Sequence, residues 1–317
     1  MTTTALPTTP VPVAAAKRGL TPQQKRSKAL RRFAGSITLA TVLGHTVLGF
    51  EQAYITPVVG VLVGLLTEFV LETVEAWAHR RPARYRGRPG ETVDFFLPSY
   101  IGGLACAMLL YGNSHLMPTV LAVVVGVGSK YVFRVNGKHF LNPSNLGIAA
   151  VLVLFPWVSI APPYQFTEWV SGPIDALVPL VVLVLGTMLN AKLTGKLPLI
   201  LGWLAGFAAQ AVLRGLFTDV SMVSALLPMT GVAFILYTNY MITDPGTTPW
   251  KPLGQVAFGV SVAAVYGLLV ELHIVFGLFF ALVLVCIGRG AGLAVLARYR
   301  RAAAAVPAEP VLTGARP

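Results

Sequence analysis

Apolar segments separated by short polar breaks follow one another from Ser36 to the C-terminal tail. Each segment is roughly 16 to 20 residues long, close to what an α-helix needs to cross the hydrocarbon core of a bilayer. The pattern therefore predicts an all-α, polytopic membrane protein with about ten transmembrane helices. The predicted helices lie at residues 34–50, 55–78, 95–112, 117–134, 144–160, 174–191, 197–217, 222–241, 253–271 and 274–297.

The ends of the chain lack this pattern. Residues 1–33 are first rich in Thr, Pro and Ala and then strongly basic, and no cleavage site of a signal peptide follows them. We expect residues 1–33 and 302–317 to be disordered cytoplasmic tails on one membrane domain at residues 34–301.

The composition agrees with a membrane protein. Of the 317 residues, 55% are hydrophobic and 11% charged, whereas about a quarter of the residues in soluble domains are charged. The net charge of +12 does not indicate nucleic-acid binding, because the basic residues sit at helix ends and not on a solvated face. Cys106 and Cys286 lie inside apolar segments without a CxxC pattern, so we assign them to the core and assign no metal site.

Basic residues also predict the orientation of the helices. In a ten-helix count, Lys and Arg gather in the loops on one side, at residues 17–32, 80–88, 130–138, 192–196, 251 and 298–301. The opposite loops carry mostly acidic residues, and Arg214 is the one basic residue there. Because positive loops stay in the cytoplasm, we expect a protein of the inner (plasma) membrane with both termini cytoplasmic.

Two polar, proline-containing stretches interrupt this apolar chain. In GKHFLNPSNLG, residues 137–147, Asn142 precedes Pro143, and in TNYMITDPGTTP, residues 238–249, Asp244 precedes Pro245. An Asn or Asp followed by Pro is typical of a helix start, and two such N-termini aimed at one cavity would bind an electron-rich group. The alternative is that both are ordinary caps at the membrane interface.

The spacing of these motifs bears on a possible internal repeat. Four predicted helices lie between them, which places both on the same side of the membrane, so a simple inverted repeat does not fit. A repeat would require one segment to be broken or re-entrant, and residues 222–241, which contain Pro228, are the best candidate.

The same two motifs carry a resemblance to a known family. GKHFLNPSNLG followed by IAAVLVLFP, and YMITDPGTTP followed by a glycine-containing apolar helix, resemble the membrane subunits of the Rnf and Nqr electron-transport complexes (RnfD and NqrB). The resemblance covers roughly residues 35 to 300. The chain is also similar, in its overall look, to the free-standing RnfD-like membrane proteins of enediyne biosynthesis clusters (UnbU type).

The resemblance implies a membrane electron-transfer protein that binds a flavin, riboflavin or FMN, and works with redox partner proteins. In the family, a threonine in a Ser-Gly-Ala-Thr segment carries FMN through a phosphoester bond. The matching segment here ends in Ile174, which has no hydroxyl, so any flavin would be held without a covalent bond. The residues expected to hold it are Lys138, His139, Asn142, Ser144, Asn145, Thr243, Asp244, Thr247 and Thr248.

Carboxylates at helical spacing form a further polar feature. Glu68, Glu72, Glu75 and His79 lie on one face of the predicted helix 55–78. Carboxylates inside a membrane are costly and often functional, so Glu68 and Glu72, together with His45 in the first helix, are candidates for a proton path. Pairing with nearby arginines at a solvated helix end is the simpler explanation for the lower part of this stripe.

The sequence leaves other functions open and assigns no catalytic residue. It contains no Walker motif, dinucleotide fingerprint, nucleophile elbow or HExxH, which leaves hydrolytic and nucleotide-dependent activity without support. The main alternative to electron transfer is a channel or carrier for a small solute or biosynthetic product, because broken helices around a polar site are typical of transporters. A scaffold that docks soluble enzymes on a basic cytoplasmic face is a third possibility.

Overall fold

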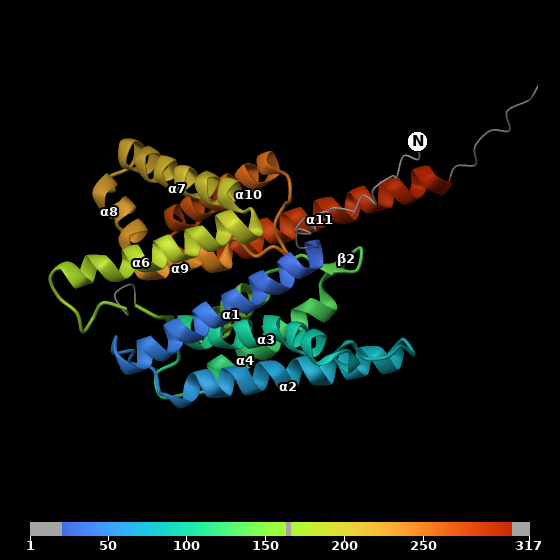
Figure 1. Cartoon of the computed structure of the whole chain (residues 1–317). Helices are drawn as coiled ribbons and strands as arrows, with labels where there is room; N and C mark the ends of the chain where they lie inside the picture. Colours follow the sequence, from blue (N-terminus) through green and yellow to red (C-terminus); the bar gives the residue numbers. More distant parts are fainter. Residues whose placement is uncertain (1–20, 163–165, 306–317) are drawn as a thin grey trace, which may run out of the picture.

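The computed structural model describes residues 21–162 and 166–305, which are almost entirely helical (Figure 1). The helices of the first half are α1 (Pro22–Thr46), α2 (Ile55–Ala78), α3 (Pro89–Leu109), α4 (Met117–Val132) and α5 (Pro143–Leu154). Those of the second half are α6 (Pro173–Leu189), α7 (Leu197–Phe217), α8 (Met222–Leu226), α9 (Val232–Leu236), α10 (Pro252–Glu271) and α11 (Gly277–Ala305). Single turns of 3-10 helix lie at Arg84–Arg86 and Leu227–Thr230, and short π-helical stretches at Asn190–Thr194 and Tyr237–Met241.

Four two-residue strands join loops into small ladders. β1 (Leu110–Tyr111) pairs with β4 (Ser159–Ile160), and β2 (Arg134–Val135) pairs with β3 (Lys138–His139) in the hairpin that leads to α5. Both pairs are antiparallel. The described chain is therefore mostly helical, as the apolar segments predict.

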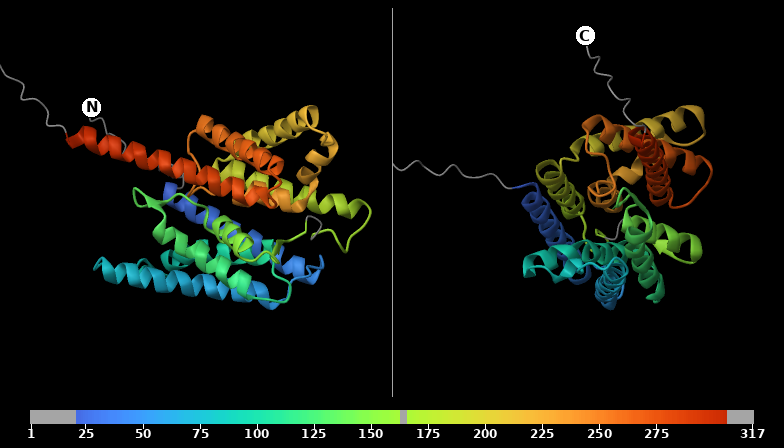
Figure 2. Two further views of the ribbon diagram at one scale, coloured as in Figure 1. Left: turned by 180° about the vertical axis from the view of Figure 1, so that it is seen from behind. Right: turned by 90° about the vertical axis from the view of Figure 1, so that its right-hand side faces the viewer.

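The two halves of the chain lie side by side along one bundle axis. Helices α1 to α5 occupy the lower part of Figure 1 and α6 to α11 the upper part, and the end-on view in Figure 2 separates the same two groups. Within the halves, α2 packs against α3 and α4, and α7 packs against α10. Contacts of α5 with α11, and of α1 with the π-helical stretch Asn190–Thr194, join the halves.

Small residues allow the closest helix contacts. A side-chain carbon added to Gly60 in α2 would lie 2.6 Å from the carbonyl oxygen of Gly103 in α3, and one added to Gly259 in α10 would lie 2.6 Å from that of Leu199 in α7. Such approach of backbones is typical of helices packed in a membrane, where dispersion contacts replace the hydrophobic effect as the driving force.

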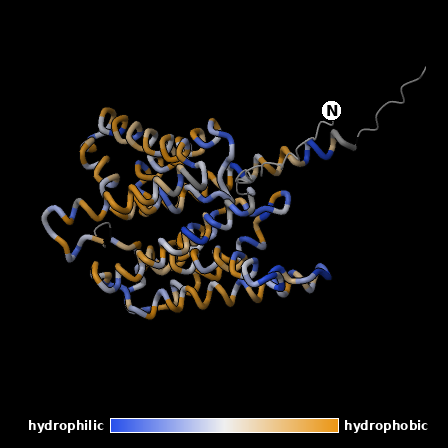
Figure 3. Tube along the Cα trace, in the orientation of Figure 1, coloured by the Kyte–Doolittle hydropathy of each residue, from blue (hydrophilic) through white to orange (hydrophobic). Residues whose placement is uncertain are grey.

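Five helices are long and apolar enough to cross a membrane: Ile55–Ala78, Pro89–Leu109, Leu197–Phe217, Pro252–Glu271 and the part of α11 at Gly277–Ala302. The pair Met222–Thr230 and Val232–Met241 counts as a sixth if it is one span bent by 65°. These helices make the chain a membrane protein, and Figure 3 shows hydrophobic residues along most of the bundle. Helices α4, α5 and α6 are apolar but shorter, so the count of ten spans stays a prediction.

The ends of the domain differ from the prediction. Residues 22–33, expected in a disordered tail, form the first turns of α1, because Thr21 and Gln24 close a capping box and Pro22 suits the first helical turn. At the other end α11 continues to Ala305, past the predicted boundary at 301. Residues 1–20 and 306–317 of the predicted tails lie outside the described residues.

The segment suspected of being broken is indeed bent. The 65° angle falls at Gly231, directly after the 3-10 turn that contains Pro228. Proline lacks the backbone N–H that a continuous helix needs, which explains the interruption. The internal repeat itself stays a prediction.

Candidate functional site

Asn142 caps α5 and also reaches the second motif. Its side-chain oxygen accepts hydrogen bonds from the backbone N–H of Asn145 and the hydroxyl of Ser144, both at 3.0 Å. Its amide nitrogen donates to the carbonyl oxygen of Met241 at 2.9 Å. The sequence-predicted helix start at Asn142–Pro143 is therefore confirmed, and this buried amide ties together two motifs that are far apart in the sequence.

The prediction that Asp244–Pro245 starts a helix is wrong. Asp244 opens a turn, in which its carboxylate accepts hydrogen bonds from the backbone N–H of Gly246 at 3.1 Å and the hydroxyl of Thr247 at 3.0 Å. The backbone carbonyl oxygen of Asp244 accepts a hydrogen bond from the hydroxyl of Thr248 at 2.6 Å. An aspartate that bonds to backbone two residues ahead is typical of an Asx turn. The helix begins only at Pro252.

The two motifs meet at one place, which we name the junction and define as residues 138–145 and 241–250. Besides the contact of Asn142 with Met241, His139 lies against the turn, because a side-chain carbon added to Gly246 would be 2.9 Å from His139 Nε2. Three elements thus contribute: the β2–β3 hairpin, the start of α5 and the loop before α10.

Two cationic side chains that sequence reasoning missed also bind the junction. Arg289 of α11 donates to the carbonyl oxygen of Thr247 at 2.8 Å, and Lys196, just before α7, donates to that of Pro249 at 2.7 Å. Arg289 had a detectable signal, because it is a charge inside an apolar segment. Lys196 looked like an ordinary loop residue.

Lys196 has an unusual environment for a lysine. Lys196 is fully buried, and its ammonium group lies 4.7 Å from the ring centre of Trp250. Burial, partly offset by the field of Asp244, lowers the pKa of Lys196 to about 8. The cation is thus held by a carbonyl and an aromatic face, and no carboxylate of the described residues is in direct contact with it.

Two of the remaining predicted cofactor residues bind protein carbonyl groups. Asn145 donates its amide to the carbonyl of Phe279 at 2.9 Å, and Thr243 donates its hydroxyl to the carbonyl of Asn239 at 2.6 Å. Lys138 is exposed on β3. The structure therefore brings Asn142, His139 and the Asp244 turn together, while Asn145 points to α11 and Thr243 back into its own segment.

A flavin does not fit the small cavity that borders the junction at Pro143 and Ser144. The cavity beside the start of α5, lined in part by Lys130, Pro143 and Ser144, has a volume of about 10 Å³, which is room for about one water. Pockets for cofactor-sized ligands are usually some 300 Å³ or more. The amides expected to grip the ring are already bonded to carbonyls. Among the described residues, no three His, Cys, Asp or Glu side chains form a group that could hold a metal ion.

Glu68 forms a buried ion pair next to this cavity. Its carboxylate accepts hydrogen bonds from the ammonium group of Lys130 in α4 and from the hydroxyl of Ser99 in α3. It accepts a third, at 2.7 Å, from the hydroxyl of Tyr131. The side chain of Glu68 is 5% exposed and that of Lys130 is 13% exposed. The ammonium group of Lys130 thus turns inward to this carboxylate.

The lower carboxylates of the stripe pair with arginines, as the simpler explanation predicts, but Glu72 is fully buried, so the prediction of a solvated helix end is wrong for it. Glu72 forms ion pairs with Arg81 and Arg84, both at 2.6 Å, and Glu75 forms one with Arg81 at 2.8 Å. The hydrogen bond to Glu72 raises the pKa of Arg81 above its usual value. Arg134 also pairs with Glu75.

The three proton-path candidates are not joined into one path. Arg84 connects Glu72 to Tyr131, whose hydroxyl binds Glu68, but the Arg84 to Tyr131 contact is long at 3.5 Å. His45 bonds to the carbonyl of Thr41 in its own helix at 2.9 Å, and its Nε2 has no partner among the described residues. The geometry thus links Glu68 and Glu72 and leaves His45 apart.

Comparison of the sequence with models of known protein families finds no match, and comparison with curated proteins finds no similar sequence either. The resemblance to RnfD and NqrB therefore rests on the two sequence motifs alone.

Proposed function

We propose that this chain is a membrane electron-transfer protein of the RnfD/NqrB type, acting with redox partner proteins. The observation that carries the proposal is the hydrogen bond from Asn142 to Met241, because it joins the two motifs on which the resemblance rests. As a free-standing protein of this type, it would serve a biosynthetic pathway like those that make enediynes.

The proposal constrains where a flavin binds. Ile174 offers no hydroxyl for a phosphoester, so riboflavin or FMN would be bound non-covalently. The small cavity among α3, α4 and α5, of about 10 Å³, cannot hold the ring, so the proposal places no flavin in that cavity. The flavin supplies the redox chemistry when bound, while the protein contributes a site away from water.

The absorption spectrum of detergent-purified protein tests this proposal. We expect a flavin spectrum, a flavin released by acid without proteolysis, and about one flavin per chain. Protein prepared with added riboflavin or FMN should give the same result if the cofactor was lost during purification. Colourless protein that takes up neither compound would contradict the proposal.

A carrier or channel for small solutes is the second candidate. Two observations favour it: the span bent by 65° at Gly231 and the cationic side chains of Arg289 and Lys196 on the junction loop. Discontinuous helices beside a polar site are the usual elements of transporters. Under this proposal the junction is a closed gate that prefers anions.

Flux into proteoliposomes separates the two candidates. A halide-quenched dye reports anion entry, and light scattering reports entry of small neutral solutes. Anion flux without any redox partner, reduced in an Arg289→Gln variant, would favour the carrier. Absence of flux together with bound flavin would favour electron transfer.

We also propose that the chain crosses the inner membrane ten times, with both termini in the cytoplasm. The start of α1 and the ends of α2 and α11 lie at the same end of the bundle in Figure 1. The basic residues of the sequence gather near that end, as expected for a cytoplasmic face. Reporter fusions after Thr46, Ala78 and Arg301 test this orientation: the first should be periplasmic and the other two cytoplasmic.

A further inference from the structure

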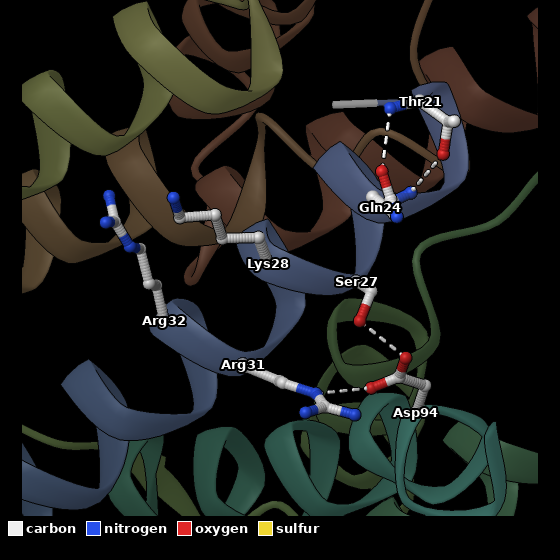
Figure 4. A pocket seen from close by; sticks show the side chains of 7 residues that line it. All are labelled: Thr21, Gln24, Ser27, Lys28, Arg31, Arg32 and Asp94. Atoms are coloured by element: carbon white, nitrogen blue, oxygen red, sulfur yellow. Dashed lines mark hydrogen bonds and ion pairs between the residues drawn. The ribbon is translucent and has the colours of Figure 1, made fainter. Parts of the chain in front are cut away.

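An open pocket lies where the first part of α1 faces α3. Its volume is about 670 Å³, and Figure 4 shows the side chains that line it. Six of them come from the start of α1, and the seventh is Asp94 of α3: Thr21, Gln24, Ser27, Lys28, Arg31, Arg32 and Asp94. The pocket is remote in sequence from both motifs of the junction.

Only some of the charges in this pocket are neutralised within the protein. Arg31 binds Asp94 at 2.7 Å and the carbonyl of Gly90 at 3.1 Å, and Ser27 donates to the same carboxylate at 2.5 Å. Lys28 and Arg32 are exposed and have no hydrogen bond or ion pair with any described residue. Figure 4 shows that both project to the same side of α1, away from Asp94.

The same face of α1 becomes apolar further along the helix. Lys28 and Arg32 are followed at helical spacing by Gly35, Leu39 and Val42, all exposed. Leu39 is 56% exposed and Val42 is 52% exposed. From Lys28 to Leu39 the helix rises about 16 Å. One face thus presents two unpaired cations and then, at a distance suited to the membrane interior, bare hydrocarbon side chains.

We propose that this face binds an anionic phospholipid, with the phosphate between Lys28 and Arg32 and an acyl chain along Leu39 and Val42. Basic pockets at the membrane-facing ends of helices bind lipid headgroups in this manner. A free phosphate would use the cations but not the apolar side chains, whereas a lipid uses both. Arg31 is paired with Asp94, so the cations left for the headgroup are Lys28 and Arg32.

Native mass spectrometry of the full chain in detergent tests the proposal. The probes are cardiolipin, phosphatidylglycerol, phosphatidylcholine and glycerol 3-phosphate. The variant Lys28→Ser/Arg32→Ser should bind the two anionic lipids about 30-fold more weakly, since each basic residue near the surface contributes roughly a factor of five. The control variant Arg300→Ser/Arg301→Ser removes two exposed charges at the end of α11 and should bind normally.

Two further variants distinguish lipid from other ligands. Leu39→Gln/Val42→Gln should weaken lipid binding and leave binding of glycerol 3-phosphate unchanged. Lys28→Arg/Arg32→Lys keeps the charge and should bind as the natural protein does. Equal affinity for glycerol 3-phosphate and phosphatidylglycerol would overturn the lipid assignment, and so would equal losses in the pocket variant and the Arg300/Arg301 control. Phosphatidylcholine bound as tightly as cardiolipin would overturn it as well.

Discussion

Replacing either member of the buried Glu68–Lys130 pair should destabilise the protein, and replacing both should restore most of the loss. Glu68→Leu leaves the ammonium group of Lys130 with only the hydroxyl of Ser99 as a described partner, at 2.9 Å. Lys130→Met leaves the carboxylate with two hydroxyl donors, Ser99 and Tyr131. The first change should therefore cost more than the second.

The burial of the pair sets the size of the effect. Breaking a buried ion pair by removing one partner costs about 3 to 5 kcal/mol, whereas replacing both partners by apolar residues is often nearly neutral. We expect a loss of about 4 kcal/mol for Glu68→Leu and about 2 to 3 kcal/mol for Lys130→Met, because the hydroxyls of Ser99 and Tyr131 still stabilise the carboxylate. The double variant should lose only about 1 kcal/mol.

The two cysteines provide the assay. Cys106 and Cys286 are each 1% exposed and free, so a thiol-reactive fluorescent dye labels them only when the protein unfolds. Heating the detergent-solubilised variants at one fixed rate gives apparent melting temperatures. A loss of 4 kcal/mol corresponds to a decrease of roughly 10 °C in a chain of this size.

The double variant decides whether the reasoning holds. If its decrease in melting temperature equals the sum of the two single decreases, Glu68 and Lys130 do not stabilise each other. Single variants that melt within about 1 °C of the natural protein would also refute the argument, because a carboxylate and an ammonium group this well buried cannot be lost singly without cost.

Three other changes test other parts of the structure with the same dye. Asn142→Ala removes the cap of α5 and the bond to Met241, and should cost about 2 kcal/mol, more than a cap alone. Gly147→Ala should fail to pack, since its new carbon would lie 2.0 Å from a carbonyl oxygen of α4, while Gly128→Ala, with open space around it, should be neutral. The lowered pKa of Lys196, about 8, means that its charged form is disfavoured by folding. Stability relative to Lys196→Met should therefore rise from pH 8 to about 10.5, by up to roughly 3 kcal/mol, and stay constant below pH 8.

The sequence predicted the helices best where apolar segments were long and clearly bounded. The bounds of α2 and α7 match the prediction at both ends. The start of α1 was missed because residues 22–33 are polar and basic, and no apolar periodicity marks their helix. That helix depends on its capping box and on Arg31 binding Asp94, a partner 63 residues away.

The candidate site was predictable only in its local parts. Asn142 followed by Pro143 gave a correct cap because capping depends on neighbouring residues. Asp244 followed by Pro245 suits a turn as well as a helix start. Gly246, whose backbone N–H binds the Asp244 carboxylate, favours the turn, and Pro252 suits the first turn of the helix that follows. The contacts of Arg289 and Lys196 with the same loop join residues 42 and 53 positions apart, and no local pattern records such pairs.

The bend at Gly231 has a consequence for how the chain is made. Its second arm, Val232–Met241, is 10 residues long and nearly all buried in protein, so it is too short to leave the translocon as an independent membrane helix. An interrupted backbone exposes peptide groups that lipid cannot solvate. The arm packs against α6, which is made before it, and the hydroxyl of Tyr237 donates to the carbonyl oxygen of Leu278 in α11, which is made after it. Its buried contacts are therefore complete only once α11 has been synthesised.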